Sequence, residues 1–188
     1  MALTRLKNRG ITDSTIADSK LSSTLDLSGK TITYGLSDGD MPSGSILQVV
    51  GTTITSYVST SSTSAWTTAA SINITPSSTS SKIAFFSNFV VNIWGTAGRL
   101  RGGIRLSRGS TIINGGGTET VQVRELAGSS FEYLPNSSLN YLDTPGTTSQ
   151  VTYNLEIIMG TGGASAFGLY SSDANGRPSY LMAMEIAG

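Results

Sequence analysis

The sequence contains no cysteine and no histidine, and charged residues make up only 13% of its 188 residues. Without cysteine there is no disulfide, no thiolate nucleophile, no iron–sulfur cluster and no cysteine-ligated zinc. Without histidine there is no Ser-His-Asp triad and no imidazole ligand for a metal. We therefore expect a protein that is not an enzyme and that carries no cofactor and no metal.

Charge and hydropathy exclude two further classes of partner. Twelve Lys and Arg residues balance twelve Asp and Glu residues, whereas a nucleic-acid-binding protein needs a net basic surface. The sequence has no run of about 18 apolar residues that could span a bilayer. Its first ten residues, MALTRLKNRG, lack the apolar core of a signal peptide. We expect neither nucleic-acid binding nor membrane insertion, and we expect release from the producing cell by lysis, as for a virus.

Ser, Thr and Gly are abundant, and these residues favour turns and half-exposed strands over helices. Within residues 43–188, short strands alternate with turns, and the clearest strand is Gln150–Met159, where apolar and polar residues alternate. Lys82–Val91 is apolar on both faces, which is expected of a strand with a core on one side and an interface on the other. About nine or ten strands without a long amphipathic helix predict an all-β fold, an antiparallel β-sandwich or jelly roll.

Residues 1–42 have a different character. Their short apolar anchors follow neither the period of one helix nor that of one strand, and such a segment cannot bury a core alone. We expect an extended N-terminal segment that packs against copies of itself or against another protein; a disordered linker is the alternative. The residues expected to make the docking contacts are Leu3, Arg5, Leu6, Lys7 and Arg9.

Low-complexity segments follow one another along most of the chain in a definite order. The first are Asn8–Asp13, Ile16–Leu21 and Leu25–Ile32, and the later ones are Ser43–Val50, Ile74–Ile83, Asp143–Tyr153 and Met184–Gly188. In this order and spacing they resemble the attachment segments and globular heads of tail-fibre-like or capsid-decoration proteins of marine and cyanobacterial tailed phages. The heads of those proteins are jelly rolls of the C1q/TNF-like type.

The resemblance implies a structural protein at the virion surface. It implies a short, trimeric, fibre-like appendage in which residues 1–42 dock onto other tail or capsid proteins and trimerise. Residues 43–188 would then form the head that binds the host surface. The alternative is a capsid decoration or cement protein that stabilises the lattice and has no receptor role. A bacterial adhesive module is a third class, but it would be expected to carry a secretion signal.

An arginine row is the most distinctive candidate site. Arg99, Arg101 and Arg105 alternate along one predicted strand and therefore share one face. Because Arg binds carboxylates and phosphates in a bidentate manner, the row could bind an anionic host glycan or a neighbouring virion protein. The simpler interpretations are a solvated face or pairing between subunits. The candidate partners for such pairing are Glu119, Glu125 and Glu156.

Two other groups of residues are candidates for binding. Trp94 lies near the end of a predicted strand, where an exposed ring could stack on a sugar, although a core or interface role is our main expectation for it. Carboxylate pairs involving Glu132 are too common on β surfaces to indicate glycoside hydrolysis. For burial in the core and between subunits we expect the strands Ser45–Val50 and Lys82–Val91, together with Met182 and Met184.

Overall fold

A computed structural model of the protein describes residues 41–95, 100–117, 120–123, 131–161, 164–170 and 179–188. These residues form strands and turns arranged in two antiparallel sheets, which confirms the predicted all-β sandwich. Within these ranges no helix is long and apolar enough to cross a membrane. The predicted docking residues Leu3, Arg5, Leu6, Lys7 and Arg9 lie outside the described residues, so their role stays a prediction.

Two sheets make up the sandwich. The strands are β1 (Ile46–Thr53), β2 (Val58–Thr60), β3 (Thr67–Ile74), β4 (Lys82–Gly95), β5 (Leu100–Arg108), β6 (Thr111–Gly115), β7 (Val121–Val123), β8 (Phe131–Tyr133), β9 (Asn136–Ser137), β10 (Tyr141–Asp143), β11 (Val151–Met159), β12 (Ala164–Leu169) and β13 (Tyr180–Ile186). One sheet has the order β1-β13-β4-β12-β2, with β8, β9 and β10 also paired to β4. The other has the order β3-β11-β5-β6, with β7 also paired to β5. We call them the β4 sheet and the β11 sheet.

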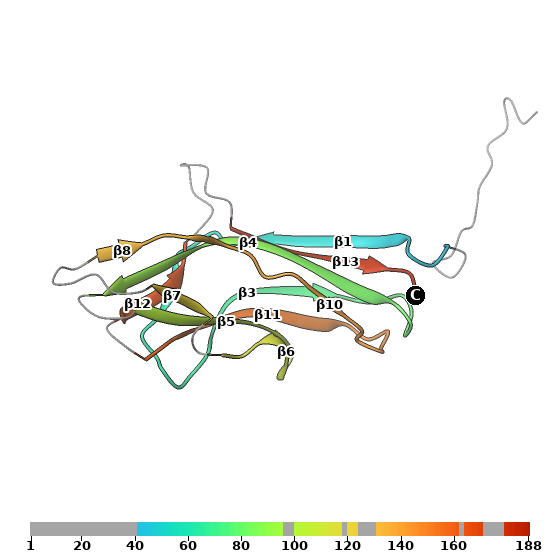
Figure 1. Ribbon diagram of the computed structural model, residues 1–188. Coiled ribbons are helices and arrows are strands. Elements are labelled where there is room, and N and C mark those ends of the chain that lie inside the picture. The colour runs from blue at the N-terminus through green and yellow to red at the C-terminus, as the bar shows by residue number, and fades with distance from the viewer. Residues whose placement is uncertain (1–40, 96–99, 118–119, 124–130, 162–163, 171–178) are drawn as a thin grey trace, which may run out of the picture. The chain divides into compact units, whose positions relative to one another are not determined.

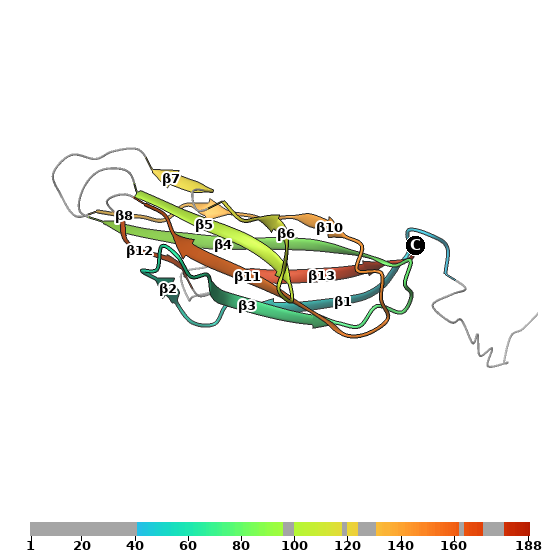
Figure 2. The same cartoon turned by 90° about the horizontal axis from the view of Figure 1, so that it is seen from below.

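The strand pairing is nested, as in a long hairpin folded back on itself. β1 pairs with β13, β3 with β11, β4 with the β8–β10 segment, and β5 with β6. This nesting is the jelly-roll arrangement of an antiparallel sandwich. Figure 1 shows β1, β4 and β13 in one layer and β3, β5 and β11 in the other, and Figure 2 shows the same layers turned by 90°.

The core lies between the two sheets, and the predicted alternation accounts for it. On β4, the inward side chains are buried and include Ile83, Phe85 and Phe89. On β11, Tyr153, Leu155 and Ile157 are fully buried and Val151 and Met159 are partly buried. The Tyr153 ring lies 4.4 Å from that of Phe85, centroid to centroid. On β5, Leu100, Ile104 and Leu106 share one face and are also buried. The period-2 pattern therefore accounts for the core faces of β11 and β5, whereas β4 is apolar on both faces and its sequence did not show which face is the core.

The described residues contain thirteen strands, more than the sequence predicts. The predicted strand Ser138–Asp143 is in fact part of a longer segment, residues 131–143, which follows one edge of β4 as three short strands. Pro135 interrupts this segment because proline has no N–H to donate to a ladder. Its carbonyl oxygen still accepts a hydrogen bond from Val91 N, at 2.9 Å, so the segment remains attached to β4.

One end of the sandwich, which we call the base, holds the point where the chain enters the head. Gly44 N donates to Ala187 O and Ala187 N donates to Ser45 O, both at 2.8 Å, so the start of β1 lies beside the C-terminal residues. Figure 1 shows the C-terminus at this end. Glu185, which is 0% exposed, accepts hydrogen bonds from Ser77 N and Ser77 Oγ at 2.7 and 2.6 Å.

The base is also where the four resemblance segments of the head meet. Ser43–Val50 and Met184–Gly188 pair through β1 and β13. Ile74–Ile83 contains the turn in which Ser77 N donates a hydrogen bond to Glu185. Asp143 pairs with Ile83, the second residue of β4. The residues that carry the resemblance are therefore concentrated at the end of the head that adjoins residues 41–45.

Candidate functional site

The outer surface of the β4 sheet is the candidate functional surface. Side chains alternate along β4, so residues between the buried ones point away from the core. Two of these outward residues, Phe86 and Trp94, are large and exposed. Phe86 belongs to an apolar region near the base, and Trp94 belongs to a mixed aromatic and polar region towards the other end of β4. Both regions are built from several strands.

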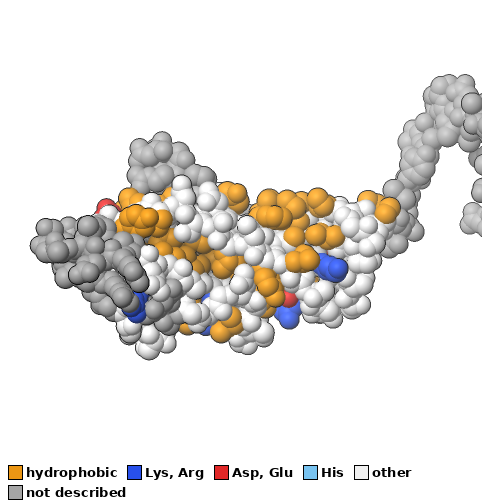
Figure 3. Space-filling view, in the orientation of Figure 1, with side chains coloured by type: hydrophobic (Ala, Val, Ile, Leu, Met, Phe, Trp, Pro, Cys, Tyr) orange, Lys and Arg blue, Asp and Glu red, His pale blue; other side chains and the backbone are white. Residues whose placement is uncertain are grey.

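The first region, which we call the apolar face, crosses four strands. Val49, Met184, Ala84 and Leu142 form one row through the registers of β1 with β13, β13 with β4, and β10 with β4. Val49 and Leu142 are each 52% exposed. The complete face consists of Ile46, Val49, Ala84, Phe86, Leu142, Met182, Met184 and Ile186. In Figure 3, hydrophobic side chains gather over the layer that holds β1, β4 and β13, and few charged side chains appear there.

The second region, which we call the aromatic cluster, consists of Tyr57, Asn92, Trp94, Glu132 and Tyr170. Trp94 pairs with Glu132 across β4 and β8, and directly opposed residues project from the same face of a sheet. Glu132 Oε1 accepts a hydrogen bond from Tyr170 Oη at 3.0 Å and another from Asn92 Nδ2. The rings of Tyr57 and Tyr170 lie 5.1 Å apart, centroid to centroid. Residues of β4 and the residue after β12 thus meet at one carboxylate of β8, and the residue before β2 packs beside them.

Local features hold the aromatic cluster in place. A Cβ added at Gly168 would lie 2.8 Å from Tyr57 Cε2, so the missing side chain leaves room for the tyrosine ring. Burial raises the pKa of the Tyr57 hydroxyl, and the charges of Tyr170 and Glu132 add to this, against a lowering hydrogen bond with Ser59. Tyr57 therefore stays protonated, and its hydroxyl can donate as well as accept.

The structure keeps two members of the predicted patch, Arg101 and Arg105, on one strand face but separates them from Trp94. Arg105 lies on the outer face of the β11 sheet, where its Nε is 2.7 Å from Glu156 Oε2 and its guanidinium lies 4.2 Å from the centre of the Trp66 ring. Arg101 shares that face and is half-buried. Trp94 lies on the outer face of the opposite sheet. The remaining member of the predicted row, Arg99, lies outside the described residues.

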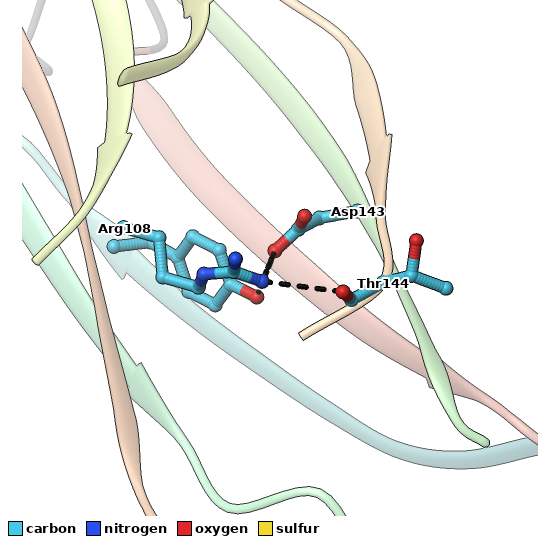
Figure 4. A network of polar contacts seen from close by, with 4 residues as sticks. Arg108, Asp143 and Thr144 are labelled. Carbon is cyan, nitrogen blue, oxygen red and sulfur yellow. Dashed lines mark hydrogen bonds and ion pairs between the residues drawn. The ribbon is translucent and has the colours of Figure 1, made fainter. Parts of the chain in front are cut away.

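A polar contact joins the two sheets near the base. Asp143, on β10, accepts a hydrogen bond from Tyr153 Oη at 2.7 Å and pairs with Arg108 Nη1 at 2.8 Å. Figure 4 shows the Arg108 guanidinium pointing at the Asp143 carboxylate and at the Thr144 carbonyl, 3.3 Å from Nη1. Burial, followed by the hydrogen bond to Asp143, raises the pKa of Tyr153 well above its usual range. We call this contact the inter-sheet clamp.

Sequence reasoning missed most of the aromatic cluster. It singled out Trp94 for its place near a strand end, but it considered Glu132 only for hydrolysis and did not consider Tyr57 or Tyr170. One signal was present: Asn92 interrupts the apolar run of β4 at an outward position. A polar amide in such a strand indicates a specific partner, because buried polar groups are hydrogen-bonded.

Comparison with known proteins gives a limited result. No family model and no curated protein matches the sequence. Among solved structures, the chain is similar to a chain in the structure of infectious bursal disease virus, Gx strain. The two are 17% identical with a TM-score of 0.39, and the match covers 85% of this chain and 39% of that chain. It is also similar to the Gt strain of that virus (16% identity, 99% and 54%, TM-score 0.36) and to its VP2 subviral particle (17% identity, 90% and 46%, TM-score 0.34). The chain thus spans between 39% and 54% of the length of these three chains, and TM-scores this low leave the likeness partial.

Proposed function

We propose that the protein is a non-enzymatic structural protein of a tailed-phage virion, located at the virion surface as a homotrimer. Residues 1–42 attach it to other tail or capsid proteins, and residues 43–188 form the head. The order of the resemblance segments supports the phage assignment. The observation that carries the structural role is the apolar face, which a lone head would leave in contact with water.

The apolar face has the properties of a subunit contact. Its four most exposed members, Ile46, Val49, Phe86 and Leu142, range from 41% to 56% exposure. Together they leave apolar surface on the order of a few hundred Å² in water, which is the size that marks interaction sites on soluble proteins. Burial of such surface contributes about 25 cal/mol per Å², so each subunit would gain several kcal/mol from this face alone. The face includes Met182 and Met184, which the sequence predicts for burial between subunits.

The layout of the head supports attachment through its base. Residues 41–45 lead into β1 at the base, so a preceding attachment segment joins the head there. Trp94 is twelve residues along β4 from Lys82, which corresponds to about 40 Å of extended strand. The aromatic cluster therefore lies far from the attachment point. This placement favours a surface appendage that presents its far end over the alternative, a decoration protein whose head is only a lattice contact.

The oligomeric state of the purified chain tests the proposal. We expect the chain to sediment at three times its mass of 19.6 kDa. Val49→Asp places a charge in the middle of the apolar face and should produce a folded monomer, because an unpaired charge is costly to bury in an interface. The matched control is Ile112→Asp, since Ile112 is 49% exposed on β6 of the other sheet. It should remain trimeric.

Two results would contradict this assignment. A wild-type chain that sediments as a monomer at micromolar concentration would leave the apolar face without a subunit to cover it. A trimer that persists in Val49→Asp would place the contact elsewhere. The position on the virion is tested by copy number: tens of copies indicate an appendage, and hundreds indicate a capsid decoration protein.

A further inference from the structure

We propose that the aromatic cluster is a binding site for neutral saccharides, with Trp94 and Tyr57 as stacking surfaces and Glu132 and Asn92 as hydrogen-bonding groups. The biological meaning of the site, recognition of a host surface, rests on the proposed function. The chemistry of the site depends only on the described residues.

The aromatic part of the cluster offers ring surface to the solvent. Trp94 is 44% exposed and Tyr57 is 45% exposed. Tyr57 packs against Tyr170 and lies over Gly168, where a side chain would collide with it. The C–H face of a pyranose ring is apolar and packs on an indole or phenol ring. A ring that is fixed before binding loses little conformational entropy when it binds.

The polar part of the cluster offers oriented hydrogen-bonding groups next to those rings. Glu132 Oε1 holds Asn92 Nδ2 and Tyr170 Oη, so the carboxylate has a fixed orientation. An ionised carboxylate has about four acceptor positions, so it can accept further hydrogen bonds from sugar hydroxyls. Asn92 Oδ1 is buried and has no hydrogen-bond partner among the described residues. A hydroxyl that reached it would satisfy an acceptor that is otherwise costly to bury.

Charge determines which class of saccharide fits. Glu132 repels a sialic acid, uronic acid or sulfated sugar, and such a ligand should bind on the order of tenfold more weakly. Among the residues that the structure describes, the cations lie elsewhere: Arg101 and Arg105 are on the other sheet, Arg108 pairs with Asp143 at the base, and Lys82 begins β4 at the base. The site therefore selects neutral sugars, in contrast to the anionic ligand considered for the arginine row.

The composition of the cluster distinguishes it from the apolar face. Cores of subunit contacts are depleted in charged residues, and a second copy placed on the cluster would bury Glu132 and leave it to find a partner. The apolar face is made of aliphatic, Met and Phe side chains. The two regions of one sheet surface are thus suited to different occupants, another subunit near the base and a saccharide towards the far end.

Tryptophan fluorescence tests the site directly, because the chain has only two tryptophans. Trp66→Phe removes the one on the β11 sheet and leaves Trp94 as the reporter. We expect cellotriose, maltotriose or chitotriose to change the emission of this variant saturably, with a dissociation constant in the millimolar range. Three sites on one particle would then act together by avidity. Sialyllactose should bind at least about tenfold more weakly.

Substitutions define which groups take part. In calorimetric titration, Trp94→Ala should lose binding and Glu132→Gln should weaken it about tenfold, as expected for loss of a charge-assisted hydrogen bond. Tyr141→Ala is the matched control, because Tyr141 is 38% exposed on β10 at the other end of β4. It should bind as the wild type does.

Three outcomes would overturn the inference. The first is the absence of any emission change with all three neutral trisaccharides at tens of millimolar. The second is equal binding by wild type and Trp94→Ala. The third is protection of Trp94 from acrylamide quenching in the trimer but not in the Val49→Asp monomer, which would make the cluster a subunit contact. A wild-type monomer that binds saccharide would refute the trimer and support the saccharide site. A trimer that binds no saccharide would support the trimer and refute the saccharide site.

Discussion

Removing the Tyr153 hydroxyl measures how strongly the inter-sheet clamp holds the sandwich together. Asp143 belongs to the β4 sheet, whereas Tyr153 and Arg108 belong to the β11 sheet. Tyr153 is 0% exposed, and its hydroxyl donates to a carboxylate at 2.7 Å. Tyr153→Phe deletes this hydrogen bond and keeps the ring that packs on Phe85. The substitution therefore isolates one polar contact from the apolar core around it.

The size of the effect follows from the chemistry of the contact. A hydrogen bond to a charged acceptor contributes about 1.5–3 kcal/mol. Asp143 keeps its ion pair with Arg108, whose side chain is 27% exposed, so solvent screens part of the remaining charge. We expect Tyr153→Phe to reduce the free energy of unfolding by about 2 kcal/mol. Asp143→Ala should cost about 3 kcal/mol, because it leaves a buried hydroxyl without an acceptor and an arginine without its partner.

Urea unfolding followed by far-UV circular dichroism measures these differences. All variants must be compared at one protein concentration, because the proposed association of subunits would add to apparent stability. A loss of about 2 kcal/mol corresponds to a decrease of about 4–8 °C in Tm for a chain of this size. In the double variant the two losses should not add, and the coupling between Tyr153 and Asp143 should be at least about 1 kcal/mol.

Two results would refute the reasoning. The first is a Tyr153→Phe variant as stable as the wild type, which would mean that the hydroxyl gains nothing over its hydrogen bonds to water. The second is strict additivity in the double variant, which would mean that the two residues stabilise the fold independently. The sequence alone could not supply this test, because it does not show that Asp143 of one sheet lies beside Tyr153 and Arg108 of the other.

Two further predictions concern the packing of the head. Burial alone would raise the pKa of Glu185, but hydrogen bonds, led by that from Gln48, lower it below 4.5. The stability it contributes is therefore fully present above pH 4.5 and lost as pH falls through the lowered value; Glu185→Gln should flatten Tm against pH below pH 4.5. Gly102→Ala would place a Cβ 1.9 Å from Phe167 Cδ2 and should cost about 3 kcal/mol in urea unfolding. Gly51→Ala, with Leu181 O 3.7 Å away, should unfold as the wild type does; equal stability of both glycine variants would refute the overlap.

Much of the fold could be predicted because the relevant signals are local. Alternation along Val151–Met159 identifies its buried face. The two-sided apolar pattern of Lys82–Val91 indicates a strand with apolar side chains on both faces of its sheet. The inward side of that strand is the core, and Phe86 on its outward side belongs to the apolar face. Each of these inferences needs only the period of a strand.

The aromatic cluster could not be predicted because its members are distant in sequence. Tyr57 precedes β2, Trp94 lies near the end of β4, and Glu132 lies on β8. They meet only through the order of strands in the β4 sheet. That order depends on pairing between β4 and β12 and on the segment interrupted by Pro135. A strand's period shows which side of a sheet a residue faces, but it does not show which strand lies next to it.

The nested pairing has a consequence for the timing of assembly during synthesis. β1 is among the first strands of the head to leave the ribosome, but its partner β13 is the last of them. Until β13 is available, one edge of β4 also lacks its partner. Met182 and Met184, which belong to the apolar face, are therefore in place only after the rest of the head has been translated. Nascent heads on one messenger RNA thus lack a complete apolar face, so the proposed trimer would form only after β13 has been translated.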